Sequence, residues 1–570
     1  MVSPKKILPE INNLLNILYD PEKASTAFTR IQELIANFPK KEEQIKEYFS
    51  QEDIVLITYA DSLVKKDEKP LQTLKFFSET YLKDIFSTIH LLPFFPYSSD
   101  DGFSVIDYLS VSPSLGSWED INQLHKNFKL MFDLVLNHIS AQSPWFKAYL
   151  QGQKEFKELA IEIDPQTDLS QVTRPRSLPL LTTFTKTSGE KIHLWTTFSA
   201  DQIDLNFSSI NVLIKMIEVL LFYLLKGATI IRLDAIAYLW KKLGTNCIHL
   251  KQTHAVVKLF KNILTLVAPK SIIITETNVP HQENISYFGN GYDEAQMVYN
   301  FTLPPLLFHT FCSENSEILS DWAKTLILPS AENTFFNFTA SHDGIGVRPL
   351  EGIITPEALE KLIKIVKENK GQVSYKKNPD GTESPYELNI TYVDAFLNKN
   401  FLKEQPKRFL ASQAIQLAIP GVPAVYIHSL LGSHNWTKGV KLTGRARTIN
   451  REKLKLDKIT TEIENPKTFR GKIFPHYIHL LKTRRKQPAF HPKAPLNVLN
   501  IDPKIFAIIR KSTTQTIYAL TNISSESFSL VLQKHNIPEY LTDLLSEKTI
   551  ARKLKLNPYQ TVWLTNNNQP

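Results

Sequence analysis

Residues 229–235 read Thr-Ile-Ile-Arg-Leu-Asp-Ala, a short and nearly continuous apolar run that carries one arginine and closes on a carboxylate. Such runs are typical of parallel strands buried on both faces, whereas half-exposed strands alternate apolar and polar residues. Seven further runs of this kind lie at 54–60, 88–94, 130–137, 271–278, 297–301, 334–341 and 422–428. Helical patterns separate them. Eight such strands with intervening helices predict an α/β chain folded as a (β/α)₈ TIM barrel.

Three stretches of the 570-residue chain do not fit the barrel rhythm and predict additional units. Residues 1–50 place apolar side chains three and four apart, which indicates an N-terminal helical extension before a barrel at 51–487. Residues 140–207, between the third and fourth strands, are too many for an ordinary connection, so we expect an inserted subdomain beside the barrel mouth. Residues 488–570 alternate short strand patterns with polar turns, which predicts a small all-β C-terminal domain.

Composition and charge exclude several classes of protein. The 66 Lys and Arg against 57 Asp and Glu give a net charge of +9, a mild bias that suits small anionic ligands. No basic run is interleaved with stacking aromatics, so we expect no nucleic-acid partner. Cys247 and Cys312 are the only cysteines, which excludes a disulfide framework and a cysteine-rich zinc site. No apolar stretch approaches the ~20 residues that cross a bilayer, and we expect a cytoplasmic monomer or homodimer without membrane contact.

Polar residues of the kind that do chemistry stand where four of the predicted strands end. The third run closes on Asp133 and His138, the fourth on Asp234, the fifth on Glu276 and the seventh on Asp343. A single Asp after a strand is most often a helix cap, but four such endings on one face of a barrel are hard to explain by capping. Since the active site of a barrel lies at the carboxyl ends of its strands, we expect these residues to share one pocket.

Three carboxylates without a metal-ligand cluster indicate glycosidic bond chemistry. One carboxylate can attack the anomeric carbon while a carboxylic acid with a raised pKa protonates the leaving oxygen, and a separation of about 5–5.5 Å between them gives retention of configuration. A third carboxylate can hold sugar hydroxyls while positive charge develops on the ring. Arg232 lies two residues before Asp234 on the same strand face and can keep that carboxylate ionised.

Four motifs carry a resemblance to a known family. They are Asp133-x-Val-x-Asn-His138, Gly227-x-x-x-x-Arg-x-Asp234, Glu276 and His342-Asp343. In this order and on these strands they resemble the signature regions of the α-amylase-type glycoside hydrolase clan (family 13). The resemblance implies that Asp234 is the nucleophile, Glu276 the general acid/base and Asp343 the transition-state stabiliser. It also implies a set of residues that bind the glucosyl unit, namely His138, Arg232 and His342.

Other strings resemble the sucrose phosphorylase branch of that clan, together with the glucosylglycerate phosphorylases. On the glucose side, the string Asp100-Asp-Gly-Phe103 implies that Asp100 binds the terminal glucose and that Phe103 forms one wall of a tight pocket. Residues 444–451 resemble the arginine motif of this branch, which implies that Arg451 pairs with Asp100 and closes the far side of the sugar.

On the acceptor side, the inserted stretch contains Arg174-Pro-Arg176 and the string Phe198-Ser-Ala-Asp-Gln202. The resemblance implies that Arg176 contacts phosphate and that Phe198 and Gln202 lie at the acceptor site. Tyr386 stands in a string that resembles the mobile loop of the branch, which implies that this tyrosine is offered to phosphate. An arginine suits this task because its guanidinium gives charge-assisted hydrogen bonds to an anion.

These features predict a retaining α-glucoside phosphorylase that transfers the α-glucosyl unit of a small glucoside to inorganic phosphate and gives α-D-glucose 1-phosphate through a covalent glucosyl-enzyme. We expect phosphate as a co-substrate, no cofactor and no metal, although Asn137 matches a position that binds structural calcium in amylases. A retaining α-glucosidase or transglucosidase that uses water or a sugar is an alternative. A non-catalytic clan member that acts as a binding subunit is an alternative of another class.

The natural acceptor stays open between glycerate and fructose. The chain is longer than the sucrose phosphorylases and reads Ala340-Ser-His-Asp-Gly where they read Asp-Thr-His-Asp-Gly. These features resemble the relatives that act on glucosylglycerate, on glucosylglycerol or on sucrose 6′-phosphate. Tyr386 stands where the sugar-phosphate-specific relatives are expected to differ, which disfavours the last of these. Glucosylglycerate and sucrose are therefore the leading substrates.

Overall fold

In a computed structural model, which describes residues 4–39, 47–378 and 380–566, eight parallel strands close into a barrel in the spatial order β1–β3–β4–β9–β10–β11–β12–β16. They are β1 (Val55–Thr58), β3 (Thr88–Leu91), β4 (Lys129–Leu134), β9 (Ala228–Leu233), β10 (Ile272–Thr275), β11 (Met297–Tyr299), β12 (Thr334–Phe338) and β16 (Val422–Tyr426). Each strand lies within or overlaps one of the eight predicted runs. The prediction of a (β/α)₈ barrel is confirmed.

The barrel strands are shorter than the predicted runs because each run continues past its strand into a loop at the barrel mouth. Every residue of β1, β3, β10 and β12 is buried, since helices cover the outer face and side chains fill the interior. β4 ends three residues before Asn137, and β9 ends one residue before Asp234. The polar residues that close the runs therefore stand above the barrel sheet.

Helices form the outer layer of the barrel. They include α3 (Pro70–Phe77), α4 (Trp118–His125), α6 (Ile210–Leu225), α7 (Lys251–Val267), α8 (His281–Ile285), α9 (Leu303–Ser313), α10 (Glu317–Ala323), α13 (Gln405–Ala418), α14 (Ile427–Leu430), α16 (Leu456–Glu464) and α17 (Phe469–Arg485). α6 is apolar almost all round because it packs on β4 and β9 with one side and on the N-terminal helix α2 (Pro21–Asn37) with another. Among the described residues, no helix combines the length and the apolar character that a membrane span requires.

Two insertions rise at the carboxyl ends of the strands and frame the mouth. Between β4 and β9 the chain forms β5 (His138–Ser140), α5 (Pro144–Leu150), β6 (Leu181–Thr185), β7 (Lys191–Trp195) and β8 (Gln202–Asp204), with β5 paired to β8 and β6 to β7. Between β12 and β16 it forms β13 (Ile345–Gly346), α11 (Pro356–Glu368), β14 (Gln372–Lys377), β15 (Glu383–Asn389) and α12 (Tyr392–Ala395). α15 (Thr437–Thr443) and the pair β2 (Leu63–Val64) and β17 (Leu454–Lys455) complete this region.

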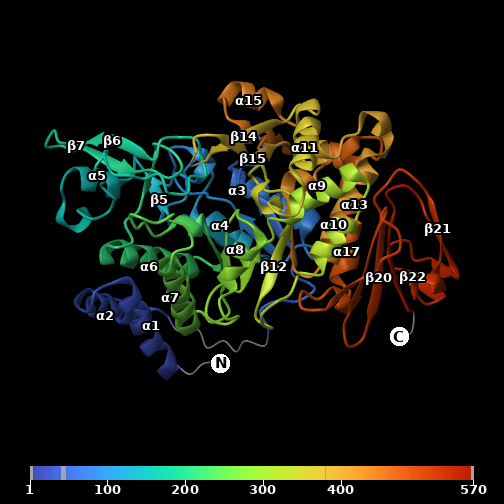
Figure 1. Ribbon diagram of the computed structural model, residues 1–570, viewed down its shortest axis with the longest axis horizontal. Coiled ribbons are helices and arrows are strands. Elements are labelled where there is room, and N and C mark those ends of the chain that lie inside the picture. Colours follow the sequence, from blue (N-terminus) through green and yellow to red (C-terminus); the bar gives the residue numbers. More distant parts are fainter. Residues whose placement is uncertain (1–3, 40–46, 379, 567–570) are drawn as a thin grey trace.

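The N-terminal residues form two helices that pack on the outside of the barrel, α1 (Pro4–Leu18) and α2 (Pro21–Asn37). Asp20 caps α2 by accepting a hydrogen bond from the Lys23 amide, and Pro21 fits the first helical turn. The Tyr19 hydroxyl donates to the Phe207 carbonyl at 2.9 Å, and Arg30 donates to Asn211 at 2.7 Å. These bonds attach the two helices to α6 and the segment before it, at the end of the molecule opposite the C-terminal sheet (Figure 1).

The C-terminal region is all-β, as predicted. Its six-stranded sheet runs β18 (Leu496–Val498), β19 (Ile505–Lys511), β20 (Thr516–Asn522), β25 (Thr561–Thr565), β22 (Tyr540–Asp543) and β23 (Thr549–Ala551), beside the pair β21 (Phe528–Val531) and β24 (Lys553–Leu556). This region has an apolar cluster of its own that includes Leu520 and Leu541. The buried Arg510 joins it to the barrel, because its guanidinium donates to carbonyls on both sides, including that of Ala418 on α13.

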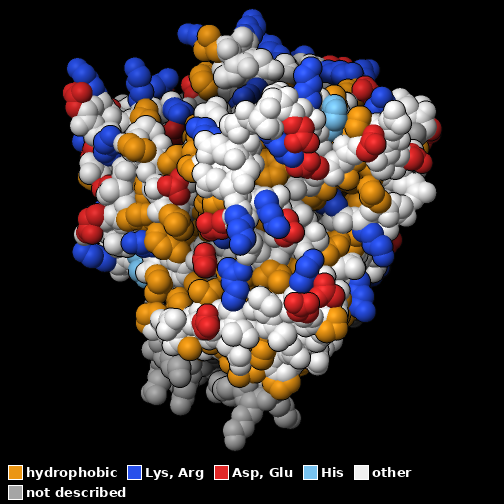
Figure 2. All heavy atoms as spheres, turned by 90° about the vertical axis from the view of Figure 1, so that its left-hand side faces the viewer, with side chains coloured by type: hydrophobic (Ala, Val, Ile, Leu, Met, Phe, Trp, Pro, Cys, Tyr) orange, Lys and Arg blue, Asp and Glu red, His pale blue; other side chains and the backbone are white. Residues whose placement is uncertain are grey.

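Surface charge is mixed on the face formed by the N-terminal helices and the first insertion. Figure 2 shows Lys and Arg side chains there interspersed with Asp and Glu, with no continuous basic stripe across this view. That distribution agrees with the low net charge per residue of the sequence.

Candidate active site

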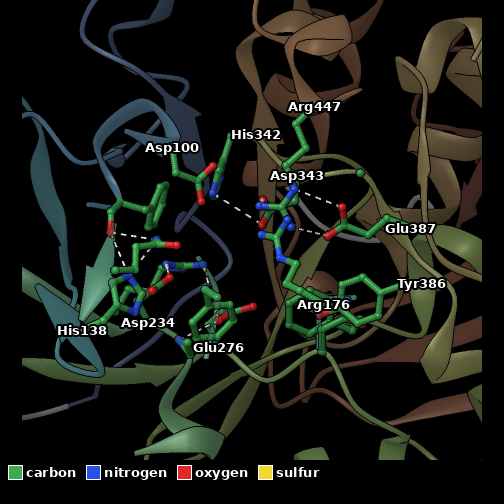
Figure 3. Close-up of a pocket in the computed structure, with 18 residues that line it drawn as sticks. Asp100, His138, Arg176, Asp234, Glu276, His342, Asp343, Tyr386, Glu387 and Arg447 are labelled. Carbon is green, nitrogen blue, oxygen red and sulfur yellow. Dashed lines mark hydrogen bonds and ion pairs between the residues drawn. The ribbon is translucent and has the colours of Figure 1, made fainter. Parts of the chain in front are cut away.

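A pocket with about 580 Å³ of open space lies at the mouth of the barrel. Twelve of the thirteen predicted site residues line it, and the labelled ones in Figure 3 approach the pocket from the strand ends and the two insertions. These twelve are Asp100, Phe103, His138, Arg176, Phe198, Gln202, Arg232, Asp234, Glu276, His342, Asp343 and Tyr386. The thirteenth, Arg451, lies behind His342 and donates from Nε to its carbonyl at 2.7 Å.

Arg232 organises the carboxylates on the floor of the pocket. Its Nη1 lies 2.6 Å from Oδ1 of Asp234 and also contacts Asp133, while its Nη2 lies 3.8 Å from Oε2 of Glu276. His90 holds the other oxygen of Asp133 at 2.7 Å. One buried guanidinium therefore reaches both carboxylates that are predicted to do the chemistry, which places them next to each other at the end of β9 and β10.

Asp234 and Glu276 share this cation but have different environments. Burial raises the pKa of Asp234, and the positive charge of Arg232 opposes that shift through direct contact. Burial also raises the pKa of Glu276, to about 7, because Arg232 is farther away and the neighbouring carboxylates Asp234 and Asp343 add repulsion. The Ala235 amide, held at φ +49°, donates to Oε2 of Glu276 at 2.8 Å and fixes the orientation of the carboxyl group. A carboxyl group with a pKa near 7 can both give and take a proton at neutral pH.

Asp343 is kept ionised by cations on the opposite wall. Burial alone would raise its pKa, but Arg447 at 2.5 Å and Arg451 at 3.7 Å outweigh that effect and hold the pKa well below its usual range. His342 lies 3.5 Å from the same carboxylate, and burial lowers the pKa of His342 to about 3. His342 is therefore neutral and can serve as a hydrogen-bonding group without adding charge.

Aromatic rings and amides form the remaining walls. Phe103 stacks on His342 with ring centroids 4.6 Å apart and nearly parallel planes. His138 lies with Nε2 2.8 Å from the Phe103 carbonyl and 3.0 Å from the Gln202 amide. Phe198 packs against His138 at 5.3 Å between centroids. Together these side chains give a ring-shaped ligand flat apolar surfaces flanked by hydrogen-bonding groups.

Asp100 reaches the pocket through a strained turn. Asp100, Asp101 and Gly102 have φ values of +52°, +49° and +112°, and a side chain at position 102 would clash with the Pro93 carbonyl at 2.6 Å. Left-handed backbone costs a non-glycine residue about 1–2 kcal/mol, which the surrounding packing must offset. Arg447, Arg176 and Arg451 lower the pKa of Asp100 against the effect of burial, so the carboxylate is ionised.

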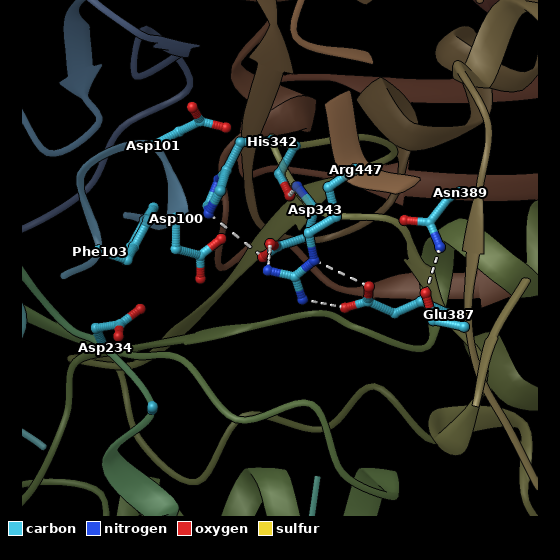
Figure 4. A network of polar contacts seen from close by, with 12 residues as sticks. Asp100, Asp101, Phe103, Asp234, His342, Asp343, Glu387, Asn389 and Arg447 are labelled. Atoms are coloured by element: carbon cyan, nitrogen blue, oxygen red, sulfur yellow. Dashed lines mark hydrogen bonds and ion pairs between the residues drawn. The ribbon is translucent and has the colours of Figure 1, made fainter. Parts of the chain in front are cut away.

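Arg451 forms the predicted ion pair with Asp100 at long range and a closer pair with the neighbouring Asp101. Its Nη1 lies 2.6 Å from Oδ2 of Asp101 but 3.9 Å from Oδ1 of Asp100, so the hydrogen-bonded pair is Arg451–Asp101. The left-handed turn separates the two carboxylates: Asp101 pairs behind the pocket, where Arg451 also lies over the Tyr59 ring, and Asp100 stays available to a ligand (Figure 4).

Arg176 and Tyr386 stand on the side of the pocket across from His138 (Figure 3). Neither the Arg176 guanidinium nor the Tyr386 hydroxyl has a hydrogen-bond or ion-pair partner within the described ranges. Arg176 is half-buried, and its positive charge acts on Asp100, Tyr238 and Tyr386. An arginine without a protein counter-ion in a pocket is suited to bind an anion.

Comparisons with known proteins decide the family. Residues 78–344 match the model of the α-amylase catalytic domain. The chain is 46% identical to the glucosylglycerate phosphorylase of Escherichia coli (strain K12), over 94% of this chain and 96% of that protein. This chain belongs to the glucosylglycerate and sucrose phosphorylase branch of family 13. It is a glycoside phosphorylase, and the sequence-based assignment to that branch is confirmed.

Two further relatives of this phosphorylase are more distant. It is 30% identical to the sucrose phosphorylase of Agrobacterium vitis, over 77% of this chain and 88% of that protein. The crystal structure of sucrose 6F-phosphate phosphorylase from Thermoanaerobacter thermosaccharolyticum matches it with a TM-score of 0.73 at 27% identity, covering 83% of this chain and 94% of that one.

The sequence reasoning missed a pair of pocket residues in this phosphorylase, Arg447 and Glu387. The guanidinium of Arg447 contacts both oxygens of Glu387, with Nε 3.0 Å from Oε2, and at the same time reaches Asp343 (Figure 4). Arg447 lies in the arginine motif at residues 444–451, and Glu387 directly follows Tyr386 in the string that resembles the mobile loop. The signal that could have found them is the opposite charge of two residues in strings already assigned to one pocket. Asn278 and Phe301 also line the pocket and were not predicted as site residues.

In this phosphorylase a lysine side chain contacts Asn137, the residue that matches a calcium-binding position of amylases. The ammonium of Lys241 lies 2.7 Å from Oδ1 of Asn137, 2.5 Å from Oδ2 of Asp204 and 2.6 Å from the Tyr238 carbonyl. Both charged side chains of this cluster are buried, with 4% and 0% exposure. Three oxygen atoms of the type that a hard cation would take are thus satisfied by a protein ammonium group.

Proposed function

We propose that this enzyme transfers the α-glucosyl unit of glucosylglycerate to inorganic phosphate, with retention of configuration and through a covalent glucosyl-enzyme. The observation that carries the proposal is the pairing of two carboxyl groups around Arg232: Asp234 is in direct contact with the cation, whereas Glu276 has a pKa of about 7. This is the division between nucleophile and acid/base that a retaining mechanism requires.

In the first step, an Asp234 oxygen attacks the anomeric carbon while Glu276 gives its proton to the glycosidic oxygen. The C1–oxygen bond breaks, glycerate leaves with that proton, and an ester bond joins the sugar to Asp234. Asp343, held ionised by Arg447, and Asp100 are placed to bind glucose hydroxyls while positive charge develops on the ring. His342 and Phe103 supply the flat wall against which the ring lies.

In the second step, phosphate takes the place that glycerate has left. Glu276, now a carboxylate, accepts the proton of a phosphate hydroxyl while that oxygen attacks C1, and the bond to Asp234 breaks. The product is α-D-glucose 1-phosphate, because two displacements restore the original configuration. Water competes for the same intermediate, so phosphate must be held beside it, and the unpaired Arg176 with the Tyr386 hydroxyl is suited to do this.

Both acceptors of this reaction are anions that use one subsite in turn. Glycerate carries a carboxylate, and phosphate carries one to two negative charges near neutral pH, so a cationic subsite serves both. The fructose unit of sucrose is neutral and would have no charge–charge attraction to Arg176. The greater identity to the glucosylglycerate phosphorylase than to the sucrose phosphorylase, 46% against 30%, supports the same choice.

We further propose that catalysis uses phosphate as a co-substrate and needs no metal ion. The support is the buried contact of Lys241 with Asn137, Asp204 and the Tyr238 carbonyl, which already supplies a positive charge at this place. Activity should therefore be unchanged after dialysis against a chelator.

The experiment is a donor and acceptor comparison with the purified protein. Glucosylglycerate and sucrose are each incubated with and without phosphate, and α-D-glucose 1-phosphate and glucose are quantified by NMR. The proposal predicts phosphate-dependent α-D-glucose 1-phosphate from glucosylglycerate at a kcat/KM at least tenfold above that for sucrose. Glucose release that does not depend on phosphate would contradict it and assign a hydrolase, and β-configured product would contradict retention.

A further inference from the structure

A second chamber adjoins the active-site pocket. It lies between the loop at residues 169–175 of the first insertion and the hairpin β14–β15 of the second, and residues from both loops line it. Tyr386 lines both this chamber and the active-site pocket. The chamber is therefore the neighbour of the subsite that we assign to phosphate and glycerate.

The lining of the chamber is rich in positive charge. Arg174, Arg348, Lys376 and Lys377, which we call the basic vestibule, contribute four cationic side chains, and Asp380 is the acidic residue of the same lining. Glu351 lies outside the lining and contacts two of the cations at long range, 3.7 Å from Arg348 and 3.9 Å from Lys376. Its side chain is 53% exposed, so solvent weakens both ion pairs.

Arg348 has unsatisfied hydrogen-bonding capacity at this place. Its side chain is only 12% exposed, and its buried Nε has no hydrogen-bond acceptor among the described residues. Arg174 donates to the neutral carbonyl of Leu178, so its charge is not balanced by that bond. Burial is the main cause that lowers the pKa of Lys376, and the positive charge of Arg348 adds to it, whereas the carboxylates of Glu351 and Glu283 act in the opposite direction. A bound anion would relieve the repulsion between the two cations and accept the free donors.

Tyr238 and Tyr386 link the vestibule to the chemistry. Tyr238 lines the chamber, and the charges that act on the pKa of its hydroxyl include those of Arg348 in the vestibule, of Glu276 and Arg176 in the active-site pocket, and of Glu283. Tyr386 is common to the two linings, and Arg176 lines the active-site pocket on the other side of this shared boundary. Cationic side chains therefore line both adjoining cavities, Arg176 in the active-site pocket and the basic vestibule in the chamber.

We infer that the basic vestibule is an anion-binding site that captures small phosphate and carboxylate ligands before they enter the active-site pocket. The phosphate part of this inference depends only on the phosphorylase activity. The carboxylate part, which concerns glycerate, rests on the proposed function. Small anions that meet a positively charged cleft bind faster and at a higher local concentration, and the advantage falls as salt screens the field.

The test uses α-D-glucosyl fluoride, a neutral donor that needs neither natural acceptor to form the glucosyl-enzyme. The double variant Arg348→Gln/Lys376→Gln is compared with Lys361→Gln/Lys364→Gln, which removes two charges from the exposed face of α11. We expect the vestibule variant to lower kcat/KM for phosphate about tenfold at low ionic strength. The difference should shrink in 0.5 M salt, where the Debye length is about 4 Å. Hydrolysis of the fluoride without phosphate should stay within twofold of the wild-type rate.

Each arm of the experiment has a result that overturns the inference or supports it. A kcat/KM for phosphate within twofold of the control variant at low ionic strength would overturn it, as would an equal loss in the phosphate-free hydrolysis. Glycerate, tested as acceptor from the same donor, should show the same salt-dependent loss. If wild-type enzyme does not use glycerate at all, the proposed function fails, while the phosphate arm still decides whether the vestibule binds anions.

Discussion

Replacing Glu276 with glutamine should remove most activity on glucosylglycerate and at the same time stabilise the fold at alkaline pH. Glutamine keeps an oxygen that accepts the 2.8 Å hydrogen bond from the Ala235 amide, so the local geometry is retained. It cannot protonate the leaving oxygen, and loss of a general acid costs about 10²–10⁴ in rate, or about 3–5 kcal/mol. An activated donor such as α-D-glucosyl fluoride, whose leaving group needs no proton, should still form the glucosyl-enzyme.

The stability effect follows from the pKa of Glu276. Its value is about 7 in the folded protein against 4.5 for a free side chain, so the folded state binds more protons between these pH values and stability falls as pH rises through them. Ionising Glu276 in the folded protein lowers the free energy of unfolding. This loss is absent below pH 4.5, is complete above pH 7, and amounts to about 3 kcal/mol at most, from 1.36 kcal/mol per pKa unit. Glu276→Gln removes the ionisation and should therefore be more stable than the wild type at pH 8 and equal to it near pH 4.5.

Two measurements check this reasoning. The kcat/KM of the wild type for glucosylglycerate should fall tenfold per unit above pH 7, because the free enzyme must carry the proton on Glu276. A separate fall at acid pH is expected where the nucleophile Asp234 becomes protonated. The variant should lack the alkaline limb of the profile, and denaturant titrations should show a stability gain of about 3 kcal/mol at pH 8 but less than about 1 kcal/mol at pH 5. An alkaline limb with the same midpoint in Glu276→Gln would refute the assignment, since another group would then carry the proton.

Four further substitutions separate roles that we propose for neighbouring groups. Asp100→Asn should lower kcat/KM at least 100-fold, because it removes a charged ligand of glucose. Asp101→Asn only weakens the contact with Arg451 behind the pocket and should lower kcat/KM less than tenfold. Equal losses would contradict the arrangement of the two carboxylates in the turn. Arg447→Met should lower kcat/KM about 100-fold by releasing Asp343 and Glu387, with a pH profile shifted because the Asp343 pKa rises; an unchanged profile would exclude this role. Lys241→Met should destabilise the protein by about 3–5 kcal/mol, because it leaves a buried carboxylate unpaired, and a melting temperature within a degree of the wild type would show that the contact does not matter.

The barrel could be predicted from the sequence because its strands are buried on both faces. Complete burial demands nearly continuous apolar runs, and even the short run at 297–301 forms β11. The ends of those runs also predicted the carboxylates of the pocket, since the backbone of a parallel barrel delivers every strand end to the same rim.

Contacts between distant loops could not be read in the same way. The pairing of Arg451 with Asp101 depends on two successive left-handed residues, and a sequence shows only that Asp tolerates that conformation. The basic vestibule joins residues from two insertions that are separated by some 170 positions in the chain. Lys241 likewise reaches Asn137 only because the loop after β9 folds back over the end of β4. Side-chain contacts of this kind depend on loop conformation, and loop conformation leaves no periodic pattern in the sequence.

The covalent attachment of glucose to Asp234 is the claim that can be tested most directly. The enzyme is incubated with a fluorosugar donor that forms the glucosyl-enzyme faster than it is released, digested, and analysed by mass spectrometry. The account predicts one fluoroglucosyl group per chain on the peptide that contains Asp234, and its disappearance when phosphate is added. A group attached to any other residue, or turnover to α-D-glucose 1-phosphate without attachment, would contradict it.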